Sequence, residues 1–162
     1  CGVRIKELVS MRICDVMDRN GQINQEVHLN RTQTKGDRGR TVYLSDKMRE
    51  LVRYYLCERF GLQDLMVVTM TNTSRALFTN QKNADRGFSP STGCQMFHYW
   101  YKDCDIAHGS SHSGRRSFIT NLANKGVAIH VLKELAGHRS IVVTEKYIAK
   151  NPAVLRASVN ML

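Results

Sequence analysis

The chain has 162 residues, enough for one domain with a hydrophobic core and too few for two of comfortable size. Hydrophobic residues make up 42% and charged residues 23%, as is typical of a soluble globular protein. The formal net charge of +10 is unusual and favours a polyanionic partner, most simply nucleic acid, although charge alone fits a ribosomal or membrane-surface protein nearly as well.

Cysteine usage and hydropathy predict a soluble intracellular protein. The five cysteines form no Cys-x-x-Cys pair, and their odd number argues for free thiols in a reducing cytoplasm. No apolar run approaches the ~18 residues of a membrane span, and no signal peptide opens the chain. The chain begins in mid-pattern with CGVRIKEL and no Met, so we expect a fragment of a longer protein.

The first sixteen residues predict one short helix. Its apolar stripe consists of Ile5, Leu8, Val9 and Ile13. Arg4 and Glu7 lie three residues apart on it, and the usual fate of such a pair is a solvated ion pair. Residues 22–44 then read as a β-hairpin around the turn GDRG, with Lys35 at the mouth of the turn. A lysine there is normally a solvated edge-strand charge.

Two helices are predicted in the middle of the chain. Ser45-Asp46 caps the first, which runs to Arg59 and ends at Gly61. Residues 62–75 have no clean period, and residues 81–87 read as a polar, basic loop. Ser89-Pro90 starts the second helix, which runs to Cys104. We expect the aromatic and apolar stripes of both helices to be core, namely Leu51, Tyr54, Tyr55, Phe60, Phe97, Trp100 and Tyr101.

The most informative stretch runs from residue 111 to residue 148. His112 and Arg115 have the i, i+3 spacing that places two side chains on one face of a helix, here one ending at Gly126. A second periodic run stops at the sequence Gly137-His138, and Tyr147 follows nine residues later. An arginine and a histidine hold an anion and a tyrosine hydroxyl can attack one, so this set could cleave a phosphodiester without a metal.

These motifs resemble the tyrosine recombinase (phage integrase) family. That family carries His-x-x-Arg, then Gly-His, then a nucleophilic Tyr nine residues later, and His112-Ser-Gly-Arg115, Gly137-His138 and Tyr147 match this order. Gly-Val-Arg-Ile-Lys-Glu-Leu around Arg4 looks like the family's first arginine motif. The resemblance covers residues 2–148.

The resemblance implies an α+β fold, mostly helical with a small antiparallel β-sheet. It assigns residues 1–162 to a single catalytic domain and places an N-terminal DNA-clamping domain and the first catalytic-domain helix outside the chain. It also implies a short strand over Ala76–Asn80 before the next helix.

The family's catalytic roles fall on six residues of this sequence. By resemblance, Arg4 and Arg115 clamp the non-bridging phosphate oxygens, with Glu7 orienting Arg4, and His138 donates a further hydrogen bond. The remaining roles concern proton and bond transfer, with Tyr147 as nucleophile, His112 accepting or guiding its proton, and Lys35 protonating the departing 5′ oxygen. The implied product is a 3′-phosphotyrosyl link with a free 5′ hydroxyl.

The resemblance also implies partners. Double-stranded DNA is the expected substrate, and the basic residues expected to contact it are Arg38, Arg40, Lys102 and Arg116, with His98 also able to face phosphate. The tail from Pro152 predicts an amphipathic helix that packs on its own domain or on a neighbouring protomer of a homo-tetramer on synapsed DNA sites. The expected location is the cytoplasm and nucleoid of a bacterium, with the gene bacterial or phage-encoded.

We expect neither a metal nor another cofactor. The sequence has no Gly-rich nucleotide loop and no carboxylate cluster for Mg²⁺. The other histidines have no metal-ligand spacing and read as non-catalytic: His28, His98, His108 and His130.

Three functions stay open at this point. The favoured one is a site-specific recombinase that integrates or excises a phage or mobile element. A type IB topoisomerase shares the phosphotyrosyl chemistry and would relax DNA instead of exchanging strands. A DNA-binding module that never cuts fits the charge and the helices, but leaves the coincidence of Arg4, His112, Arg115 and Tyr147 unexplained.

Overall fold

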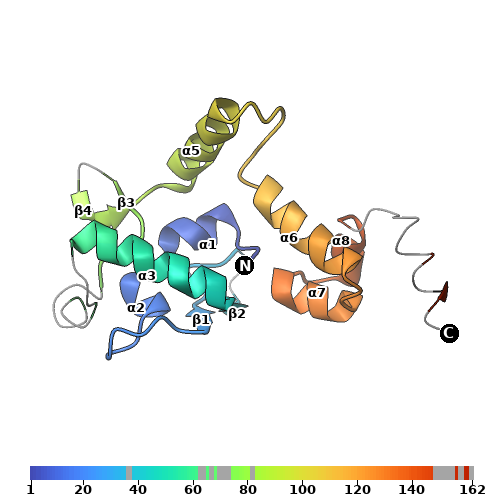
Figure 1. Ribbon diagram of the computed structural model, residues 1–162, viewed down its shortest axis with the longest axis horizontal. Coiled ribbons are helices and arrows are strands. Elements are labelled where there is room, and N and C mark those ends of the chain that lie inside the picture. The colour runs from blue at the N-terminus through green and yellow to red at the C-terminus, as the bar shows by residue number, and fades with distance from the viewer. Residues whose placement is uncertain are drawn as a thin grey trace. The chain divides into compact units, whose positions relative to one another are not determined.

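The computed structural model describes residues 1–35, 38–61, 65, 68, 74–80, 83–147, 156, 159 and 160. In this part the chain forms helices and two two-stranded antiparallel sheets, which confirms the predicted α+β, mostly helical class (Figure 1). The chain divides into two compact units. The first unit is Cys1 with Val3–Ser111, and the second is Gly2 with His112–Leu162. That all 162 residues belong to one catalytic domain stays a prediction.

The N-terminal segment forms two short helices, so the prediction of one continuous helix is wrong. Helix α1 spans Ile5–Ser10 and α2 spans Ile13–Val16, with extended backbone at Met11 and Arg12 between them. The interruption has a tertiary cause, because this backbone pairs with residues 75–77: the N–H of Ile13 donates to the carbonyl of Arg75, and that of Leu77 to Met11. These distant partners are invisible in the local periodicity.

The predicted hairpin is confirmed. Strands β1 (Glu26–Leu29) and β2 (Arg40–Tyr43) pair antiparallel, with Val27 opposite Val42 and Leu29 opposite Arg40. Val27, Leu29 and Val42 are buried, which is the alternation expected of a half-buried ribbon. Lys35 lies on the connection between the strands, and the first two residues of the GDRG turn lie outside the described residues.

Helix α3 (Asp46–Phe60) begins and ends where its capping residues predict. The hydroxyl of Ser45 accepts from the N–H of Met48, and Gly61 ends the helix with φ of 61°. Tyr55 and Phe60 pack against the core as expected. The core assignment of Leu51 and Tyr54 is wrong, since they are 52% and 65% exposed. Both are offset from the stripe of α3 that faces the core, which is centred on Leu56.

A second hairpin and helix α5 complete the first unit. β3 (Thr79–Asn80) pairs with β4 (Asn83–Gly87), so the strand expected within residues 76–80 is confirmed at its end. Within the loop expected over residues 81–87, Asn83–Gly87 form a strand instead, held by backbone pairing with β3 that the polar sequence did not signal. α5 (Pro90–Asp103) has the predicted bounds, with the Ser89 hydroxyl accepting from Thr92.

The aromatic stripe of α5 is less buried than predicted. Phe97 and Tyr101 are half-buried, whereas Trp100 is 52% exposed and meets Phe97 edge to face. The core of the first unit draws instead on α2, both strands of the first hairpin and α3. It consists of Met11, Ile13, Val16, Met17, Ile23, Val27, Leu29, Val42, Leu44, Leu56, Leu65, Val68 and Leu77.

Between residues 112 and 147, the second unit forms three helices in succession, drawn in orange in Figure 1. They are α6 (Ser113–Asn124), α7 (Ile129–Ala136) and α8 (Ile141–Glu145). α6 ends just before Gly126 and α7 ends at Gly137, as predicted. Ile119 of α6 and Leu132 of α7 are buried. The amphipathic helix predicted from Pro152 lies outside the described residues.

Two expectations about chemistry and membranes can be compared with the described part of the chain. None of the five cysteines, all described, forms a disulfide. Among the described residues, no helix has the length and apolar character that crossing a bilayer requires.

Candidate active site

Arg115 is a buried cation at the start of α6. It is 4% exposed, and its guanidinium donates hydrogen bonds to the carbonyls of Gly2 and Ala136. Ala136 is the last residue of α7, so the charge of Arg115 meets the negative end of that helix. Arg115 thereby ties α6 to the turn that carries Gly137 and His138.

His138 is held in one orientation by a buried hydroxyl. Gly137 ends α7 with φ of 62°, and His138, which follows it, is 8% exposed. The ring nitrogen Nδ1 lies 2.9 Å from Oγ1 of Thr144, which is fully buried. This hydrogen bond at Nδ1 helps to orient the imidazole and the direction of Nε2.

Tyr147 stacks on that ring. The centroids of His138 and Tyr147 lie 5.4 Å apart with an interplanar angle of 27°. The backbone of Tyr147 is fixed at both ends, because its N–H donates to the carbonyl of Thr144 and its carbonyl accepts from the hydroxyl of Thr120 at 2.9 Å. Thr120 lies on α6, so the helix that carries Arg115 also anchors Tyr147.

His112 and Arg116 lie on either side of Arg115 in the sequence and are exposed. His112 is the N-terminal cap residue of α6, with φ of −90° and ψ of −15°, and both side chains are exposed. The predicted helical i, i+3 relation of His112 and Arg115 therefore places the histidine at the very start of the helix. The second unit thus supplies four of the six predicted catalytic residues.

Arg4 belongs to the first unit and is bound to a buried carboxylate. Its Nη1 lies 3.1 Å from Oε1 of Glu7, and its backbone N–H donates to Oε2 at 2.7 Å. Glu7 is fully buried, so the solvated ion pair that such spacing usually means is excluded. Burial raises the pKa of the Glu7 carboxyl, but hydrogen bonds and positive charge from Arg40 and Arg4 outweigh it and hold the pKa below its usual range.

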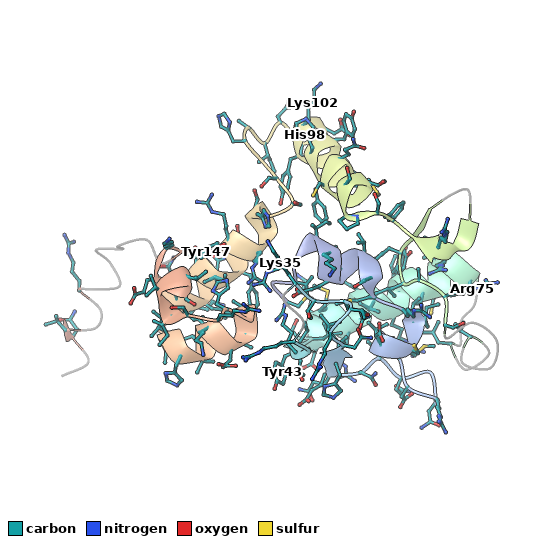
Figure 2. The ribbon with its side chains drawn as sticks, turned by 180° about the vertical axis from the view of Figure 1, so that it is seen from behind. Lys35, Tyr43, Arg75, His98, Lys102 and Tyr147 are labelled. Carbon is teal, nitrogen blue, oxygen red and sulfur yellow. The ribbon has the colours of Figure 1, made fainter. Side chains whose placement is uncertain are left out.

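Lys35 is exposed on a loop, and the preceding residue, Thr34, is held by hydrogen bonds. Thr34 is 3% exposed, its carbonyl accepts from Nζ of Lys6 at 2.8 Å, and its hydroxyl lies 2.6 Å from the carbonyl of Arg38. The loop is therefore tied to α1 and closed on itself on either side of the lysine. Figure 2 shows Lys35 on this connection and Tyr147 directly after α8.

The predicted DNA contacts have different surroundings. Arg38 and Arg116 are exposed, and so are His98 and Lys102, which Figure 2 shows together near the C-terminal end of α5. Arg40 differs from these, because its side chain is only 12% exposed and its guanidinium binds Glu7.

Sequence reasoning missed the residues that position the site. Thr144 and Thr120 hold His138 and Tyr147, and Arg40 is the second partner of Glu7. Thr120 lies 27 residues from its partner and Arg40 lies 33 from Glu7, so no spacing rule joins them. The one available signal was a hydroxyl residue between His138 and Tyr147, which is too common to be informative.

Attack on an anion by an oxygen nucleophile is the chemistry that Arg115, His138 and Tyr147 support. Arginine forks match the oxygens of a phosphate, an imidazole donates to one, and a phenol attacks phosphorus. In the described part of the chain no group of three His, Cys, Asp or Glu side chains could hold a metal ion.

Comparison with known proteins finds one matching family model and several similar relatives. The model of the phage integrase family matches residues 1–153. The chain is 28% identical over 151 residues to tyrosine recombinase XerC of Treponema denticola, and 30% identical over 146 residues to XerC of Vibrio atlanticus. Each match covers 90% of this chain, and 47% and 42% of the relative, so the chain spans less than half the length of these relatives.

Solved structures of recombinases and integrases share the fold. A crystal structure of XerA recombinase superimposes with a TM-score of 0.73 at 25% identity, over 99% of this chain and 53% of that one. The Tn1549 transposon integrase in complex with transposon right end DNA gives 0.68 at 19% identity, over 99% and 55%. The second likeness bears on the fold alone.

Proposed function

The chain belongs to the phage integrase family, and from that premise we propose that it is the catalytic part of a site-specific DNA recombinase. The reaction is cleavage and rejoining of DNA strands through a 3′-phosphotyrosyl intermediate. The observation that carries the proposal is the stacked pair of His138 and Tyr147, anchored through Thr120 to the helix that bears Arg115.

The proposed cleavage step forms one bond and breaks one. The phenolic oxygen of Tyr147 attacks the scissile phosphorus, and its proton passes to His112. The bond from phosphorus to the 5′ oxygen breaks, and that oxygen takes a proton from Lys35.

The remaining groups stabilise charge on the phosphate. Arg4 and Arg115 bind its non-bridging oxygens, and His138 donates a hydrogen bond to the same group. Such fixed donors act where negative charge develops in the transition state and need no reorganisation at the moment of reaction. The phosphotyrosyl link conserves the energy of the broken bond, so attack by another 5′ hydroxyl reverses the step and joins a new strand.

The wider proposal concerns DNA and assembly. The net charge of +10 supports a DNA partner, as does the DNA-bound state of the structurally similar Tn1549 integrase. Arg38, Lys102 and Arg116 are proposed contacts to its phosphates. We further propose a homo-tetramer on synapsed sites of a phage or other mobile element in the bacterial nucleoid, with the tail beyond residue 152 as a contact between protomers.

The test is a nicked DNA substrate, carrying the attachment site or a pool of candidate sites, incubated with the full-length protein and run on a denaturing gel. A nick beside the scissile phosphate lets the cleaved end diffuse away, so the covalent adduct accumulates. We expect an adduct that Tyr147→Phe abolishes while DNA binding is retained. Tyr43→Phe is the matched control, because Tyr43 is an exposed tyrosine on β2 and its loss should leave the adduct unchanged.

Other outcomes favour the alternatives. No adduct from the full-length protein on its cognate site, with binding intact, would support a DNA-binding module. An adduct with relaxation of a supercoiled plasmid but no exchange between two sites would support a topoisomerase.

A further inference from the structure

The guanidinium of Arg40 contacts the Glu7 carboxylate at more points than the guanidinium of Arg4 does. Its Nε lies 3.1 Å from Oε1 and its Nη2 lies 2.8 Å from Oε2, so the guanidinium spans both oxygens of the carboxylate. The guanidinium of Arg4 contacts the carboxylate through Nη1, at 3.1 Å from Oε1. A two-point fork is the stronger of the two arrangements, so Arg40 is the main counter-ion of Glu7.

The exposure of the two arginines differs in the same direction. The side chain of Arg40 is 12% exposed and that of Arg4 is 26% exposed, around a carboxylate that is fully buried. A buried carboxylate requires a partner, because an uncompensated charge in the interior is strongly destabilising. With Arg40 in place, this requirement is met from the hairpin and does not rest on Arg4 alone.

We propose that Arg40 is a positioning residue for the phosphate clamp, which neutralises Glu7 so that the guanidinium of Arg4 stays directed at the reacting phosphate. The inference rests on the proposed function of Arg4. It replaces the expectation that Arg40 contacts the DNA backbone, since a phosphate would have to compete with a buried carboxylate for the same guanidinium. It also gives β2, which carries Arg40, a part in the reaction.

The physical consequence of losing Arg40 follows from the charge balance. Glu7 would be left with Arg4 as its main cation, and the carboxylate would draw the Arg4 guanidinium into a two-point pair of its own. The N–H groups that face the phosphate would then be turned or weakened. Loss of Arg40 should therefore slow cleavage only where the substrate carries a negative charge for Arg4 to bind.

The experiment compares two substrates in single-turnover cleavage by the full-length protein. One carries the normal scissile phosphodiester, and the other a methylphosphonate, in which a methyl group replaces a non-bridging oxygen and removes the negative charge. Arg40→Gln should lose on the order of 10²-fold on the phosphodiester, the cost of misplacing a group by about 1 Å, and far less on the methylphosphonate. Arg40→Lys, which keeps the charge but not the fork, should lie between.

The matched control is Arg49→Gln. Arg49 also lies in the first unit, where it donates to the carbonyl of Ile23 at 3.0 Å and pairs with Asp46, without touching Glu7. The substitution Arg49→Gln removes the same charge and a comparable hydrogen bond. Its ratio of rates on the two substrates should equal that of the wild type.

A double-mutant cycle supplies an independent readout. In an Arg4→Gln background, Arg40→Gln should cause little further loss on the phosphodiester, because both changes act through one guanidinium. Additive losses would overturn the inference, and so would equal losses on both substrates. A fall of about one in the slope of log affinity against log salt, with cleavage unchanged, would restore Arg40 as a phosphate contact.

The failure of this inference can be told from failure of the proposed function. A wild type that forms no adduct, or a Tyr147→Phe variant that still cleaves, overturns both. A wild type with a normal adduct, together with an Arg40→Gln variant whose substrate ratio is unchanged, overturns the positioning role alone.

Discussion

At the scale of single residues, the site is organised by hydroxyl groups that no motif contains. Thr144 is fully buried and bonds Nδ1 of His138, and Thr120 holds the backbone of Tyr147. Neither threonine has chemistry of its own to offer. Their contribution is to remove the rotational freedom of the imidazole and of the chain segment that carries the phenol.

The role of Thr144 leads to a prediction with an internal control. Thr144→Val keeps the shape and leaves the buried ring nitrogen without its partner, so the free energy of unfolding should fall by about 1–3 kcal/mol. Cleavage should slow by about tenfold, equivalent to about 1.4 kcal/mol, because the imidazole is no longer oriented. Urea unfolding and single-turnover cleavage measure the two effects.

Thr41 provides the comparison. Its hydroxyl lies 2.9 Å from Nδ1 of His28, the same bond at the same length, but on an exposed face of the first hairpin. Thr41→Val should change stability by no more than about 0.5 kcal/mol, as is usual for a surface site. Equal effects of the two substitutions would show that burial of the His138 bond is not what matters.

At the scale of elements, glycine and capping residues determine where helices end. The cap residues of α3 and α5, and the glycine that ends α7, were predicted correctly because capping is a local interaction within one turn. The N-terminal helix was predicted wrongly because its interruption depends on pairing with residues 75–77. Helix ends follow from short-range chemistry, whereas helix breaks of this kind do not.

Two glycines of the second unit should respond in opposite directions to the same substitution. Gly137 has φ of 62°, so Gly137→Ala should destabilise by roughly 1–2 kcal/mol and displace His138. Gly114 lies inside α6, and a Cβ there would meet nothing within 4 Å, so Gly114→Ala should stabilise by about 0.5–1 kcal/mol. Thermal unfolding of the two variants measures both signs, and destabilisation by Gly114→Ala would contradict the open environment.

At the scale of the whole molecule, net charge governs how the protein meets its partner. A charge of +10 on 162 residues predicts DNA affinity that falls steeply with salt, because each neutralised phosphate releases counter-ions. Arg38→Gln, Lys102→Gln and Arg116→Gln should each lower the slope of log affinity against log salt by about one. Fluorescence anisotropy at several salt concentrations measures the slope. A salt-insensitive affinity would count against phosphate contacts as the main source of binding.

The predictability of the molecule follows the range of its interactions. The family, the α+β class, the first hairpin and helices α3, α5, α6 and α7 follow from the sequence alone, because motif order, periodicity and capping are encoded within a few residues of each other. The exposure of Leu51, Tyr54 and Trp100 does not follow from the sequence. An amphipathic stripe shows which face of a helix is apolar, but not how wide the contact with the core will be.

The side chains that could perform the chemistry can be identified from residue types and spacings, which are local properties of the chain around Arg4, Arg115, His138 and Tyr147. The way in which these side chains are held depends on contacts that form only on folding. The fork of Arg40 on Glu7 and the hydrogen bond from Thr120 to Tyr147 join residues 33 and 27 positions apart. Such pairs form when the chain folds and leave no periodic trace in the sequence, because the requirement to satisfy a buried charge or carbonyl can be met by any segment that folding brings near.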